Sequence, residues 1–242
     1  MKALLCGLAL LTAQSVAAHA AEVKVFSGGG FRSVLTEVAP KFESTTGHKV
    51  TVTYDANDGL ERRIKAGESF DVLLIGAPTF EVLGDKITPA PRAPVGRAGL
   101  GVAVRAGAPK PDIASVDAFK RTLLDANSVS HVADGLSGVL FLGMLNRLEI
   151  AEAMKPKLKP TVVTNVVKAV ASGEADMAVH NVPQILAERG VEFVGPVPAE
   201  IQSYINVIGG IGAAAKEPEA GKAFITFLTS DAAVPTVRAK GW

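Results

Sequence analysis

The sequence has very little cysteine, and this shortage excludes several kinds of protein. Cys6 is the single cysteine among 242 residues. It lies in an amino-terminal apolar run that has the features of a removable export signal, so the mature chain is expected to contain no cysteine. Such a chain cannot be a disulfide scaffold, a thiolate enzyme or a zinc protein with cysteine ligands.

The apolar run itself is too short to serve as a membrane anchor. Lys2 is followed by apolar residues over 3–13, and Ala18-His19-Ala20 then places small residues at the two positions that a signal peptidase recognises. Residues 1–20 are therefore predicted to be a cleavable signal peptide. This favours a periplasmic location without stable membrane insertion. The leucines before Cys6 are not the small residue that a lipoprotein signal needs.

An excess of charge of one sign is also missing. The chain has 25 Lys and Arg against 24 Asp and Glu, and removal of the signal peptide leaves 24 of each. A neutral chain without a basic run offers no electrostatic surface for nucleic acid or anionic membranes, so neither partner is expected. With 48% hydrophobic residues, the composition is that of a globular protein, neither disordered nor collagen-like.

Strand and helix patterns alternate along the chain. Strands are predicted over 22–26, 50–54, 71–75, 129–132 and 177–180, with apolar residues at helical spacing over 31–42. This alternation predicts an α/β fold with parallel strands. Prolines over 88–97 and at 196–198 interrupt it, and they predict crossing segments that continue into strands at 100–105 and 204–208. Residues 210–215 fit the dinucleotide pattern G-x-G-x-x-A, but too little chain follows for a complete unit, so a loop is predicted.

Ser27-Gly28-Gly29-Gly30 is the strongest candidate for a binding loop. It follows a predicted strand and precedes a helix, so glycine backbone N–H groups could approach an anion at a helix N-terminus. The alternative is a tight turn that binds nothing. Arg32 comes next, and guanidinium suits recognition of a carboxylate. Arg62 and Arg63 follow a second loop, Asn57-Asp58-Gly59, and at least one of this pair is expected on a solvated surface.

A similar strand, loop and helix arrangement recurs at residues 134–138. Ligands of open α/β sheets bind at the carboxyl ends of strands, so the two loops are expected to face each other across a cleft. Ser137 and Gly138 are close to the nucleophile pattern G-x-S-x-G. Val139 replaces the last glycine, however, and only His180 follows in the required partner order. Ser137 is interpreted as a binding residue.

The histidines do not indicate a metal. His48, His131 and His180 are too far apart for a helical metal pair, and no local carboxylate cluster accompanies them, so neither a metal nor a cofactor is predicted. His180 ends a predicted strand before Asn181, which places both near the cleft. His180 could donate to an anion, act as a general base or be purely structural.

Several segments together resemble a known family. They are Val25-Phe26-Ser27-Gly28-Gly29-Gly30, Gly47-His48-Lys49-Val50, Ile64-Lys65-Ala66-Gly67-Glu68, Phe70-Asp71-Val72-Leu73-Leu74, Ser172-Gly173-Glu174-Ala175-Asp176 and Phe224-Ile225-Thr226-Phe227-Leu228. In their order and spacing they resemble extracellular solute-binding proteins of the molybdate-binding type over essentially the whole mature chain.

The resemblance implies the two-lobed periplasmic binding protein fold of type II. In this fold two mixed or parallel sheets with flanking helices are joined by crossing strands, and the lobes close on a ligand. Residues 21–98 with 208–242 would form one lobe and 99–207 the other. The protein would be a monomer that captures a small anion and delivers it to the membrane permease of an ABC transporter.

The resemblance also maps ligand positions onto this chain. A serine hydroxyl of molybdate binders falls at Gly30, a serine-rich loop at residues 56–59, a tyrosine at His180, and backbone donors near Ser137 and near Val163-Thr164. The two sets of hydroxyls are absent here, and Asp58 adds negative charge. A small tetrahedral dianion needs converging donors, so an organic acid is favoured over molybdate.

A related branch resembles periplasmic aconitate isomerases, which gives an alternative of another class. Such an enzyme would hold carboxylates while one base moves a proton between two carbons. His180 and Asp58 are the candidate bases, with Ser27 or Ser137 as a relay. Binding without catalysis is preferred, because the sequence shows no base with an evident orienting partner.

Overall fold

The computed structural model describes residues 20–89 and 92–242, so the predicted signal peptide lies outside the described residues except for Ala20. The first sheet contains the parallel strands β2 (Lys49–Asp55), β1 (Glu22–Gly28) and β3 (Val72–Gly76), followed by β9 (Tyr204–Ile211), which is antiparallel to β3. The second sheet contains the parallel strands β7 (Met177–Asn181), β5 (Val129–Val132) and β6 (Leu158–Thr161).

The long strand β4 (Ala93–Arg105) belongs to both sheets. Its residues 93–99 pair with β9, whereas residues 100–104 pair with β7 and residues 101–105 with β8 (Val191–Pro196). The two sheets are thereby joined in one hydrogen-bonded order, β2-β1-β3-β9-β4-β7-β5-β6, with β8 beside β4. The division into lobes 21–98 with 208–242 and 99–207 stays a prediction.

Helices cover both faces of each sheet. They are α1 (Arg32–Thr46), α2 (Asn57–Lys65), α3 (Ala77–Val82), α4 (Val116–Asp125), α5 (Leu136–Arg147), α6 (Ala151–Met154), α7 (Val166–Ser172), α8 (Val182–Ala187), α9 (Pro218–Leu228) and α10 (Val234–Ala239), with 3-10 turns η1 (Gly29–Phe31), η2 (Gly84–Lys86) and η3 (Lys155–Lys157). Within residues 20–89 and 92–242, no helix is long and apolar enough to cross a membrane.

Four clusters of buried apolar side chains hold these layers together. Phe42 and Phe224 pack edge to face, with 5.0 Å between ring centroids, in the cluster under α1, α9 and α10, and Leu60 and Phe80 are buried beneath α2 and α3. The second sheet has separate clusters of its own, one around Phe141 and one around buried valines of α7. Each sheet therefore has its own core on both faces, as expected for a buried parallel sheet.

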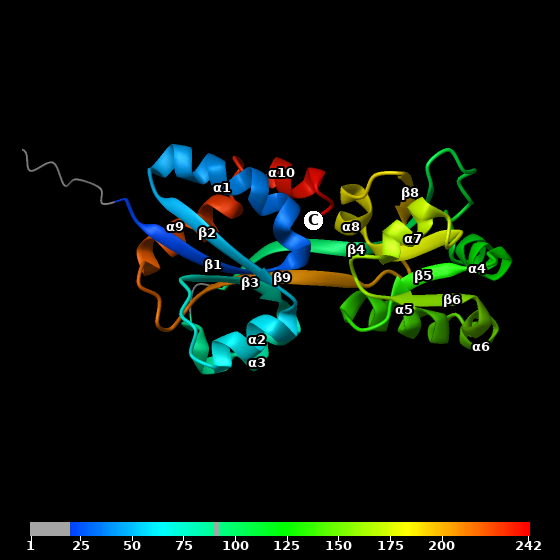
Figure 1. Cartoon of the computed structure of the whole chain (residues 1–242), viewed down its shortest axis with the longest axis horizontal. Helices are drawn as coiled ribbons and strands as arrows, with labels where there is room; N and C mark the ends of the chain where they lie inside the picture. The colour runs from blue at the N-terminus through cyan, green and yellow to red at the C-terminus, as the bar shows by residue number, and fades with distance from the viewer. Residues whose placement is uncertain (1–19, 90–91) are drawn as a thin grey trace, which may run out of the picture.

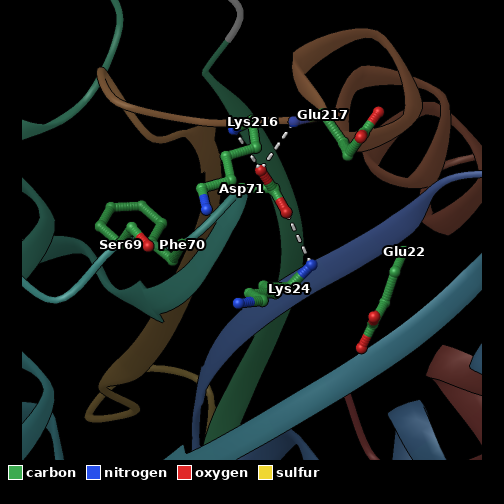
Figure 2. Close-up of a pocket in the computed structure, with 7 residues that line it drawn as sticks. All are labelled: Glu22, Lys24, Ser69, Phe70, Asp71, Lys216 and Glu217. Atoms are coloured by element: carbon green, nitrogen blue, oxygen red, sulfur yellow. Dashed lines mark hydrogen bonds between the residues drawn. The ribbon is translucent and has the colours of Figure 1, made fainter.

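A buried carboxylate fixes the outer end of the first sheet (Figure 2). Asp71 is 2% exposed and accepts hydrogen bonds from the backbone N–H groups of Lys24, Lys216 and Glu217, at 2.8, 2.7 and 2.9 Å. A buried ionised group is tolerated when charge-assisted hydrogen bonds replace its water. Asp71 thereby ties β1 to the segment that enters α9.

The strand polarity brings the candidate loops to the middle of the molecule. The carboxyl ends of β1, β2 and β3 belong to one parallel set, and those of β5, β6 and β7 to another. In Figure 1, α1 and α5 both begin near the middle, on either side of the region that β4 and β9 cross. The loops that follow β1 and β5 therefore lie toward the junction of the two sheets.

Two sequence predictions about crossing segments are corrected. The strand predicted from residue 100 begins at Ala93 and includes Pro94, because a shift of register between Pro94 and Gly96 accommodates the proline. The predicted loop at residues 210–215 is wrong at its start, since Gly210 and Ile211 lie in β9 opposite β3. A Cβ on Gly210 would lie 2.6 Å from the ring of Phe80, so this glycine makes room for packing.

Candidate functional site

The glycine loop after β1 has one open position and one covered position. A Cβ on Gly29 would meet no atom of residues 20–89 or 92–242 within 4 Å, whereas a Cβ on Gly30 would lie 3.5 Å from Trp242 and 3.7 Å from Nε2 of Gln184. Ser27 is fully buried, and its hydroxyl donates to the carbonyl of Gly28 at 3.2 Å. The loop thus offers backbone rather than a hydroxyl on its open side.

Asn57 occupies a slot between two strand ends. Its Oδ1 lies 3.0 Å from the position of a Cβ on Gly28, and its Nδ2 lies 2.9 Å from that of a Cβ on Gly76. The absence of side chains at these two glycines lets the amide reach between the ends of β1 and β3. Sequence reasoning named Gly28 and Asn57 but missed Gly76, because the contact depends on pairing between distant strands.

The other predicted residues of the second loop point elsewhere. Asp58 is exposed and forms an ion pair with Arg62 at 2.7 Å, and this hydrogen bond lowers the pKa of the Asp58 carboxyl. A Cβ on Gly59 would lie 2.5 Å from the carboxylate of Asp55, so that acidic side chain already lies against the start of α2. The beginning of α2 is therefore poorly suited to a second anion.

The three arginines considered from the sequence have different partners. Arg62 pairs with Asp58, and Arg63 pairs with Glu68 at 2.6 Å. The guanidinium of Arg32 instead lies 3.8 Å from the ring centroid of Tyr54, and no carboxylate of the described residues lies within 4.0 Å of it. Burial raises the pKa of Tyr54, partly offset by the charge of Arg32. Arg32 is thus an exposed, oriented cation that remains available to a carboxylate.

In the second sheet, Ser137 and Gly138 are packed into the structure, whereas Val163 and Thr164 are exposed. Ser137 is 7% exposed within the first turn of α5, and none of its described contacts is a hydrogen bond to a histidine. A Cβ on Gly138 would lie 2.1 Å from the carbonyl oxygen of Val132. The glycine is therefore required by the close approach of α5 to β5, and the structure gives no support to a serine nucleophile.

His180 is held by its own surroundings. The side chain is 1% exposed; its Nδ1 accepts from the N–H of Asn181 at 2.9 Å, and its Nε2 lies 3.3 Å from the carbonyl of Val163. The first contact leaves the proton on Nε2, which donates to Val163. Burial lowers the pKa of His180 to about 4. At neutral pH the ring is uncharged, and both nitrogens are engaged, so His180 orders the end of β7.

His131 is a second buried histidine, with a different hydrogen-bond pattern. Its Nδ1 lies 2.9 Å from the carbonyl of Val132 and donates to it, which leaves the lone pair on Nε2. The centroid of the His131 ring lies 5.7 Å from that of the Phe141 ring. Burial lowers the pKa of His131. From the sequence, His131 is considered only as a candidate metal ligand. Among the described residues, no group of three histidine, cysteine or acidic side chains could hold a metal ion.

Residues 241–242 reach both parts of the candidate site. Trp242 packs edge to face on Phe31, with 5.2 Å between ring centroids, while a Cβ on Gly241 would lie 2.9 Å from Val182 at the start of α8. The indole nitrogen of Trp242 and Oδ1 of Asn181 are buried and have no hydrogen-bond partner among the residues that the structure describes. Sequence reasoning missed Trp242 and Gln184, because no local pattern shows that the last residues meet the first loop.

The predicted site residues fall into two groups, one on each sheet. Ser27, Gly28, Gly29, Gly30, Asn57 and Arg32 lie at the carboxyl ends of β1 and β2, whereas Ser137, Gly138, Val163, Thr164, His180 and Asn181 lie at the ends of β5, β6 and β7. The contact of Gln184 with Gly30 links them. Two cavities lie elsewhere: about 170 Å³ beside Asp71 (Figure 2) and about 550 Å³ beside Gln202 and Tyr204.

Comparison with known proteins identifies related sequences. Residues 23–242 match the family described as bacterial extracellular solute-binding protein. The chain is 30% identical, over an alignment of 246 residues, to an aconitate isomerase from a Pseudomonas species, covering 98% of this chain and 92% of that protein. It is 25% identical over 240 residues to the molybdate-binding protein ModA of Azotobacter vinelandii, covering 93% and 91%.

Solved structures share the fold at low sequence identity. The periplasmic molybdate-binding protein of Azotobacter vinelandii superposes with a TM-score of 0.73 at 19% identity, over 90% of this chain and 97% of that one. The sulfate-binding protein SubI of Mycobacterium tuberculosis gives 0.72 at 17% identity, over 92% and 86%. These proteins have the type II periplasmic binding protein fold, so the predicted fold class is confirmed. The chain belongs to the family of bacterial extracellular solute-binding proteins.

Proposed function

We propose that this protein captures a small organic acid in the periplasm and delivers it to the permease of an ABC transporter. The ligand would lie between the carboxyl ends of the two sets of parallel strands. The protein would act as a monomer, and its two predicted lobes would close over the ligand. The glycine loop would supply backbone donors, and Arg32 would pair with a carboxylate of the ligand.

Arg32 is the observation that carries this proposal. Arg62 and Arg63 form ion pairs with Asp58 and Glu68, whereas Arg32 is stacked on Tyr54 without an acidic partner among the described residues. Stacking on an aromatic face orients a guanidinium and leaves its N–H groups free for bidentate contact with a carboxylate. A carboxylate ligand would therefore complete an arrangement that the chain leaves open.

The first loop also argues for an organic acid over molybdate. Ser27, the only hydroxyl of that loop, is fully buried and directed at the carbonyl of Gly28. The start of α2 already carries Asp55 and Asp58. A compact dianion would meet few hydroxyl donors and two nearby negative charges, whereas an extended acid can place one carboxylate at Arg32 and its remaining atoms elsewhere in the site.

A thermal-shift panel on residues 21–242 tests the proposed ligand class. The compounds are molybdate, tungstate, sulfate, citrate, tricarballylate, cis-aconitate and trans-aconitate. A ligand that binds only the folded state stabilises it by RT ln(1 + L/Kd), where L is the free ligand concentration, so the midpoint rises with the logarithm of that concentration once it exceeds Kd. We expect at least one polycarboxylate to stabilise the protein and molybdate to leave it unchanged. Stabilisation by oxyanions alone would contradict the proposal.

An aconitate isomerase activity is the second candidate, because the Pseudomonas relative of that name is 30% identical over nearly the whole chain. The reaction would need one base to remove a proton from the carbon beside the double bond and a proton to be returned at the other end. The described residues offer poor candidates for that base. Asp58 is paired with Arg62, and both nitrogens of His180 are hydrogen-bonded.

Proton NMR of each aconitate isomer incubated with the protein separates these two functions. A receptor leaves trans-aconitate chemically unchanged, while an isomerase converts it to the cis isomer and labels the product with deuterium in deuterium oxide. The His180→Gln and Asp58→Asn variants then identify whether either predicted base takes part. Conversion that both variants retain would exclude these residues and point to another base.

A further inference from the structure

The strand β4 changes its hydrogen-bonded neighbour at Leu100. On one edge of β4, Gly99 is opposite Tyr204 of β9, and Gly101 is opposite Pro196 of β8. Leu100, between them, is fully buried. A strand that changes partners leaves backbone groups to be satisfied at the point of change, because buried N–H and C=O groups need hydrogen bonds.

The side-chain amide of Gln202 fills this gap. Its Oε1 accepts from the N–H of Leu100 at 2.8 Å, and its Nε2 donates to the carbonyl of the same residue at 2.9 Å. Gln202 therefore pairs with Leu100 as a strand backbone would. The direction of the amide is fixed by this contact, since a flipped amide would set donor against donor and acceptor against acceptor.

The same amide also holds the connection between β8 and β9. Nε2 of Gln202 donates to the carbonyl of Val197 at 3.1 Å, and Oε1 accepts from the N–H of Ser203 at 3.0 Å. All four contacts of one planar group are thus made with backbone. Gly99 makes room for it, because a Cβ there would lie 2.9 Å from the Gln202 amide.

These contacts join the two routes by which the chain passes between the sheets. One route is β4 itself, and the other is the segment that leaves β8 at Pro196 and enters β9 at Tyr204. We propose that Gln202 is a positioning residue that fastens these two routes together and sets the orientation of one sheet relative to the other. It therefore controls how the candidate loops of the two sheets face each other.

This role differs from an ordinary stabilising contact in what its loss would change. Removal of a stabilising side chain lowers the free energy of unfolding but leaves the mean geometry of the folded state unaltered. Removal of the Gln202 amide would leave the N–H of Leu100 and the carbonyl of Val197 without this partner. The carbonyl of Leu100 would keep the N–H of Val197 at 3.0 Å, and the separate cores of the two sheets would stay intact. The two sheets would then take a wider range of relative orientations.

Pulsed electron–electron double resonance on doubly spin-labelled protein measures the range of relative orientations of the two sheets as a distribution of label-to-label distances. Residues 21–242 contain no cysteine, so the variants Ser44→Cys on α1 and Lys168→Cys on α7 can be labelled without background. Both positions are exposed, and each lies on a helix that packs against a different sheet. The Gln202→Ala and Gln202→Glu variants are compared with the labelled wild type. The glutamate keeps the side-chain length but removes both donated hydrogen bonds.

We expect both variants to widen the label-to-label distance distribution about twofold or to shift its mean. The matched control is Ser115→Ala, which removes the side-chain cap of α4, where Ser115 accepts from the N–H of Ala118. It should lower the thermal midpoint without changing the distances. If Gln202→Ala does not fold, Gln202→Glu decides the question. Distributions identical to wild type in a folded Gln202 variant, or equal widening in Ser115→Ala, would overturn the proposal.

Discussion

The glycine loops that follow β1 and β5 resemble each other in sequence, but their glycines have different structural roles. Gly29 faces open space, whereas a Cβ on Gly138 would lie 2.1 Å from the carbonyl oxygen of Val132. The first loop leaves its backbone accessible, and the second lets a helix pack closely on a strand. A glycine-rich turn is therefore weak support for a binding site until its surroundings are known.

The same contrast applies to the polar side chains beside the two loops. Arg32, next to the first loop, is exposed and has no acidic partner among the described residues, whereas His180, in the second group, is buried with both ring nitrogens engaged. The first sheet is expected to recognise the ligand's charge, and the second to provide a rigid opposing surface. Four substitutions or pH changes test this difference.

The largest expected effect is on stability, from Gly138→Ala. The new methyl would overlap the Val132 carbonyl, and relief of such a backbone clash costs about 3 kcal/mol or more. Urea unfolding followed by circular dichroism measures the loss. The matched variant Gly29→Ala should change the free energy of unfolding by less than about 0.5 kcal/mol, as at ordinary surface positions. Equal losses would show that the two loops do not differ.

A large effect on binding, without one on stability, is expected from Gly29→Val. A β-branched side chain would prevent a ligand from approaching the loop backbone closely, and affinity should fall about a hundredfold or more. Calorimetric titration with the most stabilising polycarboxylate measures the change. The variant should unfold at the same urea concentration as wild type. Unchanged affinity in this variant would exclude the loop from the site.

Acid should lower the free energy of unfolding through protonation of His180. Its pKa of about 4 in the folded state lies below the ordinary value of 6.5, so the unfolded state binds more protons between these values and stability falls as pH decreases through that window. Between pH 7 and 4.5 the loss should be about 2 kcal/mol. Urea titrations at both pH values test this. In His180→Gln the pH dependence should be reduced by about that amount; an equally steep decline would assign the effect to other groups.

The smallest of these effects is expected from Arg32→Ala. Loss of a charge-assisted hydrogen bond to a carboxylate should weaken binding about tenfold, corresponding to about 1.4 kcal/mol. Arg62→Ala is the matched control, because that guanidinium is already paired with Asp58. Titration of both variants with the same polycarboxylate compares them. Equal weakening in both would mean that Arg32 acts only through the general field of positive charge.

Sequence reasoning predicted the regular parts of the fold well, because their apolar periodicity is local. The strands at β1, β2, β3, β5 and β7 were all indicated by short apolar or alternating runs. The strand β6 was missed, since Leu158–Thr161 contains Lys159 and Pro160 and is only partly buried. It lies at the end of the sheet order, where an edge strand tolerates proline and charge.

The site was predicted less completely, because its contacts link distant parts of the sequence. Asn57 was identified as a loop residue, but its position between Gly28 and Gly76 follows from strand pairing. Trp242 lies next to Gly30 only after the whole chain has folded. Asp58 could be placed near the loop from its position, while its ion pair with Arg62 depends on helix geometry and side-chain direction.

The most direct test of the account is calorimetric titration of residues 21–242 with trans-aconitate, tricarballylate and molybdate under identical conditions. A site built on Arg32 and the open glycine loop should bind at least one of the two carboxylic acids stoichiometrically and show no heat with molybdate. Stoichiometric binding of molybdate with no binding of either acid would contradict the assignment of the ligand class.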